Sequence, residues 1–584
     1  MLHAMHFARL CEALEAAKNT SSRNAKVAAI AGALAEAARS GPLDLRTAVR
    51  VSLGDLSRLG VGWRALGGAL GARLGETNDA RIVEATRRLG DLGDAAFELI
   101  ERSGDKNAAR SEPLELADVD ALTTGLRAAT SRAKRAALIT AAFARSTALE
   151  AKFLVKALSG ELRIGAAPGV VLLAITSAFA ADEAKVRRAH GLLADLAEVA
   201  VLAHEKKLDE ANVEPGRPLA FMLATPIETI QSPIDYRAVI AEEKLDGVRA
   251  QIHVVHGAAT IFARGLERVT SAFPEVAAAF AGVTTDLVLD GEILAIAEDG
   301  RSRPFQALQM RLGRKAPSAE LIALVPLCFV AFDVLVRGRD VLVDRPWRER
   351  RAALEAIATE LGKRTAFTIK DALEVADSAA VDAAFDRARK NGNEGLVLKK
   401  KDAKYEAGKR GQSWLKVKKA TATLDVVVTA AEQGHGGRAS VISDYTFAVW
   451  KGDELVDVGK AYSGLTDPEI DQLSRHFVET TLEVRGGWRK VSPDVVLEVG
   501  FDGIQRSDRH ASGFSLRFPR ILKIREDKRP DECDTIETVE ALYLAQIASG
   551  HREEPVAPPP APKRSAKSTK SSAQLSLFGE ERKK

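Results

Sequence analysis

Residues 239–255 read VIAEEKLDGVRAQIHVV, in which two apolar runs lie on either side of a charged turn. Both runs are rich in Val and Ile, residues that favour strands, and so they predict a pair of strands. The Asp246-Gly247 dipeptide between them is a turn signal. Lys244 then stands at the end of the first strand, where its amine can face a cleft. This lysine is the first candidate for a catalytic residue.

The sequence around this stretch, residues 215–419, has the mixed texture of an α+β domain. It begins at Pro215-Gly-Arg-Pro218, and short apolar runs then alternate with stretches of helical character. The predicted strands are Val239–Glu243, Val248–Val255, Leu287–Ala295, Leu327–Leu335 and Glu394–Lys399, and the predicted helices are Arg348–Leu361 and Ala379–Arg389. We expect the strands to form a mainly antiparallel sheet.

Residues 1–208 predict an all-α domain. They are rich in Ala, Leu, Arg and Glu, and their apolar residues recur at helical spacing, as in Phe7, Leu10, Cys11 and Leu14. The run Leu192–Val199 comes close to the same spacing. Thr20-Ser-Ser22 supplies an N-cap signal for the helix that follows it.

Residues 420–545 carry a second strand-rich pattern. The predicted strands are Leu424–Val428, Tyr445–Lys451, Glu454–Gly459 and Val495–Phe501, with turn signals between them. Short strands in so short a region predict a small β-barrel of the OB-fold type. Residues 551–584 are first Pro-rich and then Lys/Ser-rich, and they lack the apolar content that a core requires, which predicts a disordered tail.

Composition narrows the possible classes of protein. The chain has 584 residues, a formal net charge of +4 and no apolar run long enough to cross a bilayer, which argues against a membrane protein, a disordered polymer and a fibrous repeat. Three cysteines without a CxxC pair argue against a disulfide scaffold or a zinc finger and fit a reducing compartment. The chain opens without a signal-peptide pattern, so we expect a cytoplasmic protein.

The position of the charges is more informative than their total. The tail, residues 551–584, holds eight basic and four acidic residues, so it carries the whole excess and the rest of the chain is neutral. Two basic runs stand out within that neutral body. Residues 399–419 hold nine Lys and Arg against two acids, and residues 505–529 hold eight against three. Such runs suit contacts with the phosphates of a nucleic acid.

Further motifs follow Lys244 in a fixed order. They are Phe262-Ala-Arg264, Leu289-Asp-Gly-Glu292, Ala331-Phe-Asp333, Glu394-Gly-Leu-Val-Leu-Lys399, Ser413-Trp-Leu-Lys416-Val-Lys418 and Arg525-Glu-Asp527-Lys528. The ordered set resembles the nucleotidyl-transferase motifs that ATP-dependent DNA ligases, RNA ligases and mRNA capping enzymes share. Three other segments, Thr20–Arg23, Gly160–Gly165 and Arg517–Arg520, resemble those of eukaryotic and archaeal DNA ligases. The resemblance therefore points to an ATP-dependent DNA ligase.

The resemblance implies three chemical steps. The Lys244 amine attacks the α-phosphate of ATP to give Lys244–AMP and pyrophosphate, the AMP passes to the 5′-phosphate of a nick, and the 3′-hydroxyl displaces it. The attacking amine must be neutral, so its pKa must fall below the usual value of about 10.4. Lys416 and Lys418, two apart on a predicted strand, can lower it and can neutralise charge on the phosphate oxygens.

The resemblance also assigns roles at the nucleotide. Glu242 meets the adenine edge and Phe332 stacks on its face, with core packing as the alternative for this Phe. Arg249 and Glu292 hold the ribose, and Arg264 lies near the transferred phosphate. The resemblance also assigns roles at the metal and at the outer phosphates. Glu292 and Glu394 bind Mg²⁺, and Asp290 is either a metal ligand or a strand-end cap. Arg525 reaches the β- and γ-phosphates when its domain closes about a hinge at residues 418–424.

The expected substrate is nicked duplex DNA, which three lobes would encircle. Arg163 and Arg520 are the expected phosphate contacts, and Phe305 and Phe518 match aromatic residues that press into the minor groove, with ordinary core packing as the alternative for each Phe. In the tail, Gln574, Leu575, Leu577 and Phe578 resemble the QLxLF peptide with which bacterial replication proteins bind the sliding clamp. This peptide and the Ala/Arg-rich composition predict a bacterial source, and we expect a monomer associated with the nucleoid.

Two other functions compete with this one. An RNA ligase or capping guanylyltransferase explains Lys244 but leaves the helical region and residues 517–528 without a role. A catalytically silent DNA-binding scaffold leaves the nucleophile and both motif carboxylates unexplained. Three scattered cysteines cannot build the four-cysteine zinc site of NAD⁺-dependent ligases, so ATP is the expected cofactor. Use of ADP or GTP stays open at this point.

Overall fold

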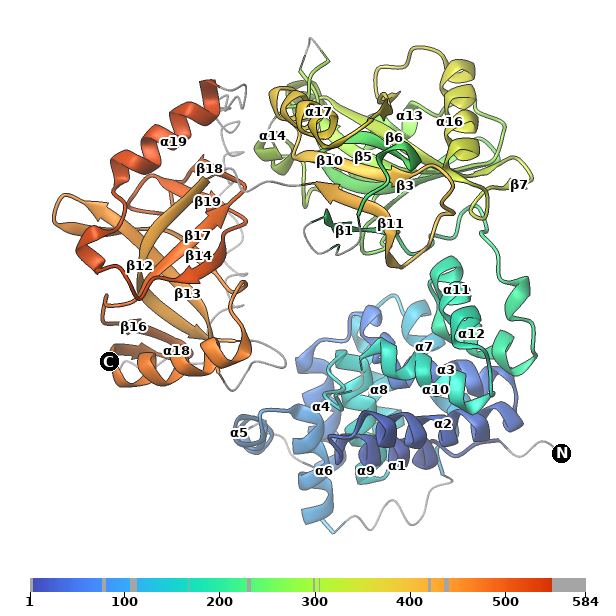
Figure 1. The fold of residues 1–584 in the computed structure, drawn as a ribbon. Helices are drawn as coiled ribbons and strands as arrows, with labels where there is room; N and C mark the ends of the chain where they lie inside the picture. The colour runs from blue at the N-terminus through green and yellow to red at the C-terminus, as the bar shows by residue number, and fades with distance from the viewer. Residues whose placement is uncertain are drawn as a thin grey trace.

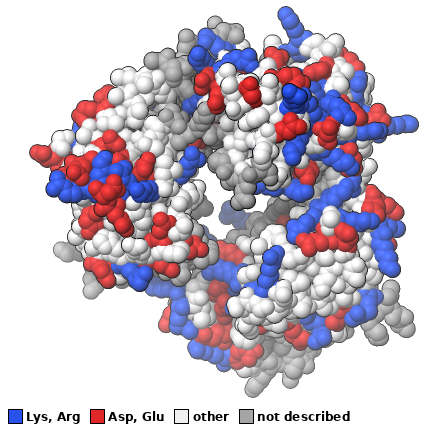
Figure 2. All heavy atoms as spheres, in the orientation of Figure 1, with Lys and Arg blue, Asp and Glu red and all other residues white. Residues whose placement is uncertain are grey.

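The computed structural model describes residues 4–75, 80–104, 113–165, 167–227, 230, 233–297, 300–303, 305–417, 422–434 and 441–548. The chain forms three lobes in sequence order: a helical N-terminal lobe, a central lobe of mixed sheets and helices, and a C-terminal sheet lobe (Figure 1). An opening lies between the three lobes in the space-filling view (Figure 2). In the described part of the chain, no helix has the length and apolar character needed to span a membrane.

The N-terminal lobe consists of α-helices. They are α1 (Phe7–Lys18), α2 (Arg23–Ser40), α3 (Pro42–Leu53), α4 (Trp63–Leu74), α5 (Ala80–Leu89), α6 (Leu92–Arg102), α7 (Leu116–Ala128), α8 (Arg132–Arg145), α9 (Ala148–Ser159), α10 (Pro168–Ala178), α11 (Glu183–Leu193) and α12 (Leu196–His204). The predicted spacing from Phe7 to Leu14 is confirmed, because these apolar side chains are all buried. They join one large core in which the residues of α9 from Ala148 to Leu158 are almost all buried.

Local signals explain where these helices begin and end. The predicted N-cap before α2 is confirmed, since the Ser22 side chain accepts a hydrogen bond from the backbone N–H of Ala25 at 3.3 Å. The predicted helical run 192–199 is divided between two helices. Ala194 adopts a left-handed conformation with φ 49°, and the Asp195 side chain caps α12. An aspartate that can cap a new helix therefore outweighs continuous apolar spacing.

The central lobe contains two mainly antiparallel sheets. Its strands are β1 (Leu223–Pro226), β2 (Val239–Lys244), β3 (Val248–Val255), β4 (Ala258–Ala263), β5 (Leu287–Ala295), β6 (Leu327–Arg337), β7 (Asp340–Val341), β8 (Phe367–Ile369), β9 (Leu373–Glu374), β10 (Gly395–Lys400) and β11 (Arg410–Val417). Its helices are α13 (Pro274–Ala278), α14 (Phe305–Gln309), α15 (Ala319–Leu324), α16 (Trp347–Leu361) and α17 (Ser378–Lys390). All five predicted strands and both predicted helices are confirmed to within about two residues.

The two sheets of the central lobe contact each other through a shared apolar cluster. One sheet has the order β1-β11-β10-β2-β9, and the other has the order β4-β3-β5-β6-β7 with β8 paired to β6. An apolar cluster contains Leu335 of β6, Trp414 of β11 and Tyr405, and so joins residues of both sheets. Leu192 of α11 belongs to the same cluster, so the helical lobe packs directly against this core.

The C-terminal lobe is built mainly of strands. They are β12 (Ala422–Gln433), β13 (Ile442–Lys451), β14 (Glu454–Ala461), β15 (Thr481–Arg485), β16 (Trp488–Val491), β17 (Val496–Phe501), β18 (Gly503–Arg506), β19 (Phe514–Arg517) and β20 (Arg520–Ile524), with helices α18 (Asp467–Glu479) and α19 (Ile536–Ala548). The four predicted strands are confirmed. The helices were not predicted, although Thr466 and Glu469 form a capping box at the start of α18 that the sequence displays.

A buried ion pair fixes α16 to β6. The Arg350 guanidinium donates to both Asp333 oxygens at 2.7 and 2.9 Å, and the two side chains are 0% and 1% exposed. Arg350 also donates to the backbone oxygens of Arg345 and Ala403. Asp333 directly follows Phe332, so this pair holds the part of β6 that carries the predicted adenine-stacking residue.

Replacing Arg350 by Met removes one partner of this pair and leaves Asp333 buried without a counter-charge. We expect a loss of about 3–5 kcal/mol in the free energy of unfolding of the central lobe, measured by urea denaturation followed by Trp fluorescence. The matched control is Arg348→Met on the same helix. Arg348 pairs with Asp402, and both side chains are exposed, so loss of this ion pair should cost less than about 1 kcal/mol. Equal effects of the two substitutions would contradict this assignment.

Candidate active site

Lys244 and Glu394 meet where the neighbouring strands β2 and β10 of the five-stranded sheet end and begin. Lys244 ends β2 and is the register partner of Gly395, the first residue of β10. The Lys244 Nζ atom lies 2.5 Å from Glu394 Oε2, and the Glu394 backbone N–H donates to the Lys244 carbonyl oxygen at 2.8 Å. The strand pairing thus brings the predicted nucleophile and a predicted metal ligand into contact across 150 residues of sequence.

Two glycines make this close arrangement possible. Gly247 follows the charged turn, and a Cβ atom there would lie 2.3 Å from the Ile293 carbonyl oxygen and 2.9 Å from Glu292 Cγ. Gly395 has φ +147°, and a Cβ atom there would lie 2.4 Å from the Val417 carbonyl oxygen. The glycines of both motifs are therefore required by close backbone approach, at Gly395 together with a conformation that favours glycine.

Arg249 is the most connected side chain of the site. Its guanidinium donates to Asp290 at 2.7 and 3.2 Å and to the Met222 carbonyl oxygen at 2.6 Å. Tyr405 donates its hydroxyl hydrogen to the same Asp290 carboxylate at 2.7 Å. Burial opposes the charge of Arg249, but the neighbouring Asp290 outweighs it and raises the Arg249 pKa. Asp290 therefore lies inside β5 as the counter-charge of Arg249, a role different from both alternatives expected for it.

Two aromatic rings lie against these groups. Phe332 and Trp414 lie edge to face with their ring centroids 6.0 Å apart, and the Arg249 guanidinium lies 5.5 Å from each ring centroid. The Lys399 ammonium lies 4.6 Å from the Phe332 centroid and 4.5 Å from the Trp414 centroid. Phe332 is only partly buried, which leaves it accessible to a planar ligand.

Glu242 lies beside Lys399 with one carboxylate oxygen unpaired. Its Oε2 atom lies 2.7 Å from Lys399 Nζ, while Oε1 is buried and has no hydrogen-bond partner among the described residues. A buried acceptor without a donor is costly, so the site fits a ligand that supplies an N–H group, such as the exocyclic amine of adenine. Sequence reasoning missed Lys399, Trp414 and Tyr405, although the first two belong to motifs already singled out.

A second carboxylate faces the Lys244–Glu394 pair. Glu292 on β5 is the register partner of Arg249 on β3. Burial raises the Glu292 pKa to about 8, and the negative charge of Glu394 adds to this effect while Lys244 and Arg249 oppose it. Two carboxylates that disfavour each other's charge fit a shared cation. Among the described residues there is no group of three or more His, Cys, Asp or Glu side chains that could hold a metal ion.

Three further residues, Lys416, Arg264 and Lys418, were predicted to bind the nucleotide. Lys416 lies on β11 as the register partner of Val397, which in turn pairs with Glu242, so all three follow one line across the sheet. Arg264 lies in the exposed turn after β4. Lys418 lies outside the described residues.

The C-terminal lobe contacts the turn after Lys244. The Arg517 guanidinium lies 3.1 Å from one Asp246 oxygen and 3.4 Å from the other. The same guanidinium lies 5.9 Å from the Phe305 ring centroid and 5.5 Å from that of Phe518. Phe518 is 64% exposed and has φ 49°. The tertiary structure therefore gathers both predicted minor-groove aromatics beside the candidate nucleophile, with Arg517 as an additional residue between them.

Arg525 forms ion pairs with carboxylates of its own lobe. Its guanidinium donates to Asp425 at 2.9 and 3.0 Å and to Asp527 at 2.9 Å, and Lys528 donates to Asp425 at 2.6 Å. All four residues belong to the C-terminal lobe. In this conformation the lobe therefore presents Arg517 to the nucleotide site and keeps the Arg525 motif bound to its own carboxylates.

The two predicted DNA-binding segments of the helical lobe lie side by side. The Lys26 ammonium of α2 donates to the Ile164 carbonyl oxygen at 2.6 Å and thereby joins residues 160–165 to the helix that follows residues 20–22. Arg163 in that segment has a half-exposed side chain, donates to the Gly90 carbonyl oxygen at 2.7 Å and pairs with Glu161. Both segments reach the surface of the lobe.

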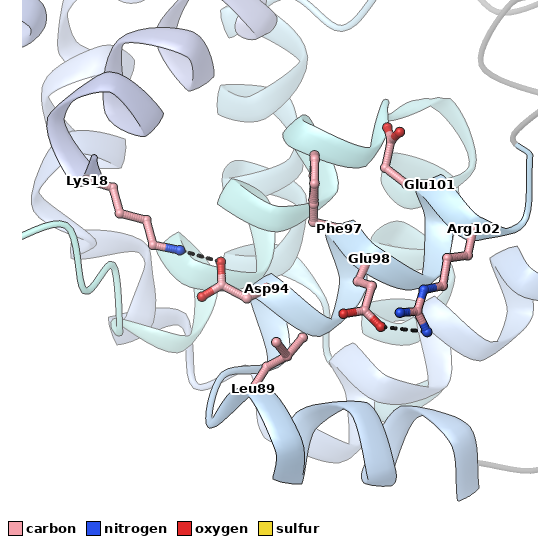
Figure 3. Close-up of a pocket in the computed structure, with 7 residues that line it drawn as sticks. All are labelled: Lys18, Leu89, Asp94, Phe97, Glu98, Glu101 and Arg102. Atoms are coloured by element: carbon pink, nitrogen blue, oxygen red, sulfur yellow. Dashed lines mark hydrogen bonds and ion pairs between the residues drawn. The ribbon is translucent and has the colours of Figure 1, made fainter. Parts of the chain in front are cut away.

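A hollow of about 540 Å³ lies elsewhere in the helical lobe (Figure 3). It is lined by Lys18, Leu89, Asp94, Phe97, Glu98, Glu101 and Arg102. Its charged groups pair with one another, Lys18 with Asp94 at 2.6 Å and Glu98 with Arg102 at 3.0 Å. Burial alone would raise the Asp94 pKa, but hydrogen bonds from Lys18 and Lys152 lower it to about 2. The Lys18–Asp94 pair joins α1 to α6, whereas the Glu98–Arg102 pair lies within α6.

Three models of protein families match the chain in order. The model "DNA ligase N terminus" matches residues 4–176, "ATP dependent DNA ligase domain" matches 221–418, and "ATP dependent DNA ligase C terminal region" matches 438–528. The chain belongs to the ATP-dependent DNA ligase family. The family predicted from the ordered motifs is thereby confirmed. The helical region, which the alternative of an RNA ligase or capping enzyme left unexplained, matches the N-terminal domain of this family.

Individual relatives agree with this assignment. The chain is 42% identical to a probable DNA ligase of Koribacter versatilis, over 83% of this chain and 86% of that relative. It is 34% identical to a DNA ligase of Methanothrix thermoacetophila, over 92% of this chain and 98% of that relative. A solved structure titled Pmar-Lig_PreS3 is 18% identical and gives a TM-score of 0.56 over 88% of this chain and 99% of that one, which shows a shared fold.

Gly247→Ala tests the glycine requirement beside Lys244. The added methyl group would push against Ile293 and Glu292, so we expect Lys244 adenylation to fall at least tenfold, equivalent to about 1.4 kcal/mol, with a thermal midpoint lowered by a few degrees. Incorporation of label from α-phosphate-labelled ATP measures the first effect. Gly68→Ala in α4 is the control, because a Cβ atom there meets nothing within 4 Å. Full labelling of the Gly247 variant would refute the assignment.

Proposed function

We propose that this chain seals 3′-hydroxyl/5′-phosphate nicks in duplex DNA through a covalent Lys244–AMP intermediate, with ATP as the adenylate donor. The observation that carries the proposal is the contact between Lys244 Nζ and Glu394 Oε2 at 2.5 Å, together with the buried Glu242 Oε1 atom, which has no hydrogen-bond partner among the described residues. A nucleophile, a neighbouring carboxylate and an acceptor for the purine base are what adenylate transfer requires.

The proposed division of labour follows the lobes. Residues 1–208 bind DNA, residues 215–419 carry the adenylation chemistry, and residues 420–545 form an OB-fold that contacts both nucleotide and DNA. The strands of this last region, from β12 to β20, and its core around Val426, Phe447 and Leu497 support the barrel assignment. Residues 551–584 form the tail. The protein acts as a monomer in the cytoplasm, at the nucleoid.

In the first step the purine binds beside Glu242 and Phe332. Glu242 accepts a hydrogen bond from the adenine amine, held in place by Lys399, and the base stacks on Phe332. Arg249 and Glu292 hold the ribose, and Arg264 and Lys418 approach the phosphates. Lys416 and Arg525 neutralise charge that gathers on the phosphate oxygens.

Lys244 must lose a proton before its nitrogen can attack the α-phosphate. Its hydrogen-bond partner Glu394 Oε2, at 2.5 Å, is the nearest group able to take that proton or to release the amine from the ion pair. Glu292 and Glu394 are the residues that would hold Mg²⁺, and a bound Mg²⁺ supplies positive charge to the phosphate oxygens.

In the later steps the DNA occupies the opening between the lobes (Figure 2). Arg163 and Arg520 contact phosphates and so position the duplex without reading its sequence. Phe305 and Phe518, which flank Arg517, press into the minor groove beside the nick. Their distance from Lys244 along the chain is large, yet Arg517 links them to the turn that follows this lysine through Asp246.

Labelled ATP tests the nucleophile directly. Incubation with ATP labelled in the α-phosphate should give one covalent label per wild-type molecule, and Lys244→Ala should reduce this label by at least 10³-fold because no other amine occupies this position. Lys451→Ala, at an exposed lysine of the C-terminal lobe, should keep full labelling. Undiminished labelling of Lys244→Ala would overturn the proposal, and competition with GTP together with nicked DNA or RNA substrates identifies the nucleotide and the acceptor.

The tail peptide Gln574, Leu575, Leu577 and Phe578 is proposed to bind a bacterial sliding clamp. This segment lies outside the described residues, so the proposal rests on the sequence alone. Binding of this peptide to the clamp would raise the local concentration of the ligase at a clamped nick.

Deletion of residues 574–578 should abolish capture of the ligase by an immobilised bacterial clamp and leave Lys244 adenylation unchanged. Scrambling the same five residues provides a control for tail length. Undiminished capture after the deletion would contradict the proposal.

A further inference from the structure

Asp425 binds Arg525, which the proposed first step assigns to the phosphates of ATP, and Lys528 of the same motif. Its carboxylate accepts hydrogen bonds from Arg525 Nη1 at 2.9 and 3.0 Å and from Lys528 Nζ at 2.6 Å. The hydrogen bond from Lys528 to Asp425 raises the Lys528 pKa, and Asp527 together with Asp425 raises that of Arg525. Two carboxylates thus balance two cations, and the cluster carries no net charge.

Asp425 is held in place by its own backbone. Its N–H donates to Asp534 Oδ2 at 2.8 Å, and its carbonyl oxygen accepts a hydrogen bond from the Asp534 N–H at 3.0 Å. The segment that follows Lys528 is also fixed, because the Trp450 indole N–H donates to the Pro530 carbonyl oxygen at 2.7 Å. The contact between Asp425 and the two cations is therefore part of an ordered arrangement and not a chance encounter of long side chains.

The same conformation places another arginine at the nucleotide site. Arg517 contacts Asp246, two residues after Lys244, while Arg525 and Lys528 bind Asp425. Asp425 belongs to β12, the first strand after residues 418–421, where the chain passes from the central to the C-terminal lobe. A carboxylate at this point can satisfy the Arg525 motif whenever Arg517 occupies the site.

We propose that Asp425 is a positioning residue that takes the place of the pyrophosphate group of ATP, by holding Arg525 and Lys528 away from the nucleotide during the DNA steps. This inference rests on the proposed function, since it concerns which step each face of the C-terminal lobe serves. Carboxylate and phosphate oxygens accept the same charge-assisted hydrogen bonds from Arg and Lys. Asp425 and the triphosphate therefore compete for one set of donors.

The competition has a consequence in each direction of the first step. In the forward direction, ATP must replace Asp425 on Arg525 and Lys528. In the reverse direction, a pyrophosphate oxygen attacks the α-phosphorus of Lys244–AMP, the N–P bond breaks, ATP forms and the Lys244 nitrogen takes up a proton. Removing the Asp425 charge should strengthen the binding of ATP and of pyrophosphate alike, because binding is reduced by the fraction of molecules in which the donors are occupied.

Asp425→Asn in the full-length protein tests this inference. We expect the KM for ATP in Lys244 adenylation to fall about three- to tenfold, and the pyrophosphate concentration that removes half of the AMP from Lys244 to fall by a similar factor. Sealing of a chemically pre-adenylated nick, which needs no ATP, should become more sensitive to inhibition by added ATP. A gain in nucleotide affinity is not a result that a merely destabilised lobe can produce.

Two further variants make the test specific. Asp444→Asn is the matched control, since Asp444 is a carboxylate of the same lobe with the same 14% exposure, paired with Lys460 at 3.4 Å and away from the Arg525 motif. It should leave both concentrations within twofold of the wild type. Asp425→Glu restores the charge and should return the KM for ATP toward the wild-type value.

The outcomes separate this inference from the proposed function. A wild-type protein that takes no label from ATP contradicts the proposed function. A wild-type protein that is labelled, together with an Asp425→Asn variant whose KM for ATP is unchanged or raised, overturns the role of Asp425 and leaves the ligase function standing. If the Asn variant does not fold, the same prediction applies to Asp425→Ser, with thermal unfolding as the check.

Discussion

The buried ion pair between Arg249 and Asp290 is the interaction on which the central lobe depends. It joins β3 to β5 within one sheet, while the hydrogen bonds of Arg249 to Met222 and of Tyr405 to Asp290 reach segments that flank the other sheet. A buried charge is tolerated only when its partners satisfy it, so these residues must come together in one geometry. The same Arg249 guanidinium lies 5.5 Å from the ring centroids of Phe332 and Trp414.

The same principle of paired charges runs through the rest of the structure. Lys399 is buried beside Glu242, Lys244 pairs with Glu394, and the cations of the Arg525 motif pair with carboxylates of their own lobe. A neutral charge balance in residues 1–550 is therefore compatible with a protein that handles phosphates, because its basic residues are paired with acidic ones that a phosphate can replace. The charge sum of the chain conceals this exchange, and only the positions of the pairs reveal it.

Sequence patterns predicted the elements whose signal is local. The runs 248–255 and 287–295 are apolar and bounded by turn residues, and they form strands with those bounds. The run 192–199 has a helical period, but Asp195 caps a second helix inside it, so two helices form. In α18 the capping box was visible, yet the strand-rich texture around it concealed the helix.

The part of the candidate site that could be predicted consists of residues whose type and place in a motif indicate their chemistry. Lys244, Glu242, Glu292 and Glu394 were identified because a lysine and carboxylates occur in ordered motifs. Lys399, Trp414 and Tyr405 were missed, because a lysine among apolar strand residues or an aromatic in a loop gives no sign of which face it joins. Their roles follow from strand register and from packing between sheets, which depend on contacts between residues far apart in the chain.

The sequence by itself determined the helical, mixed and strand-rich regions and the family to which the chain belongs, because periodicity, turn residues and motif order are local properties. Tertiary structure alone decided that Asp290 is a counter-charge, that Arg517 contacts Asp246, and that Asp425 binds the cations of the Arg525 motif. The physical reason is that an ionised group takes whichever partner the fold brings within hydrogen-bond distance. The sequence shows which residues are charged, and the packing of the lobes determines which of them form ion pairs.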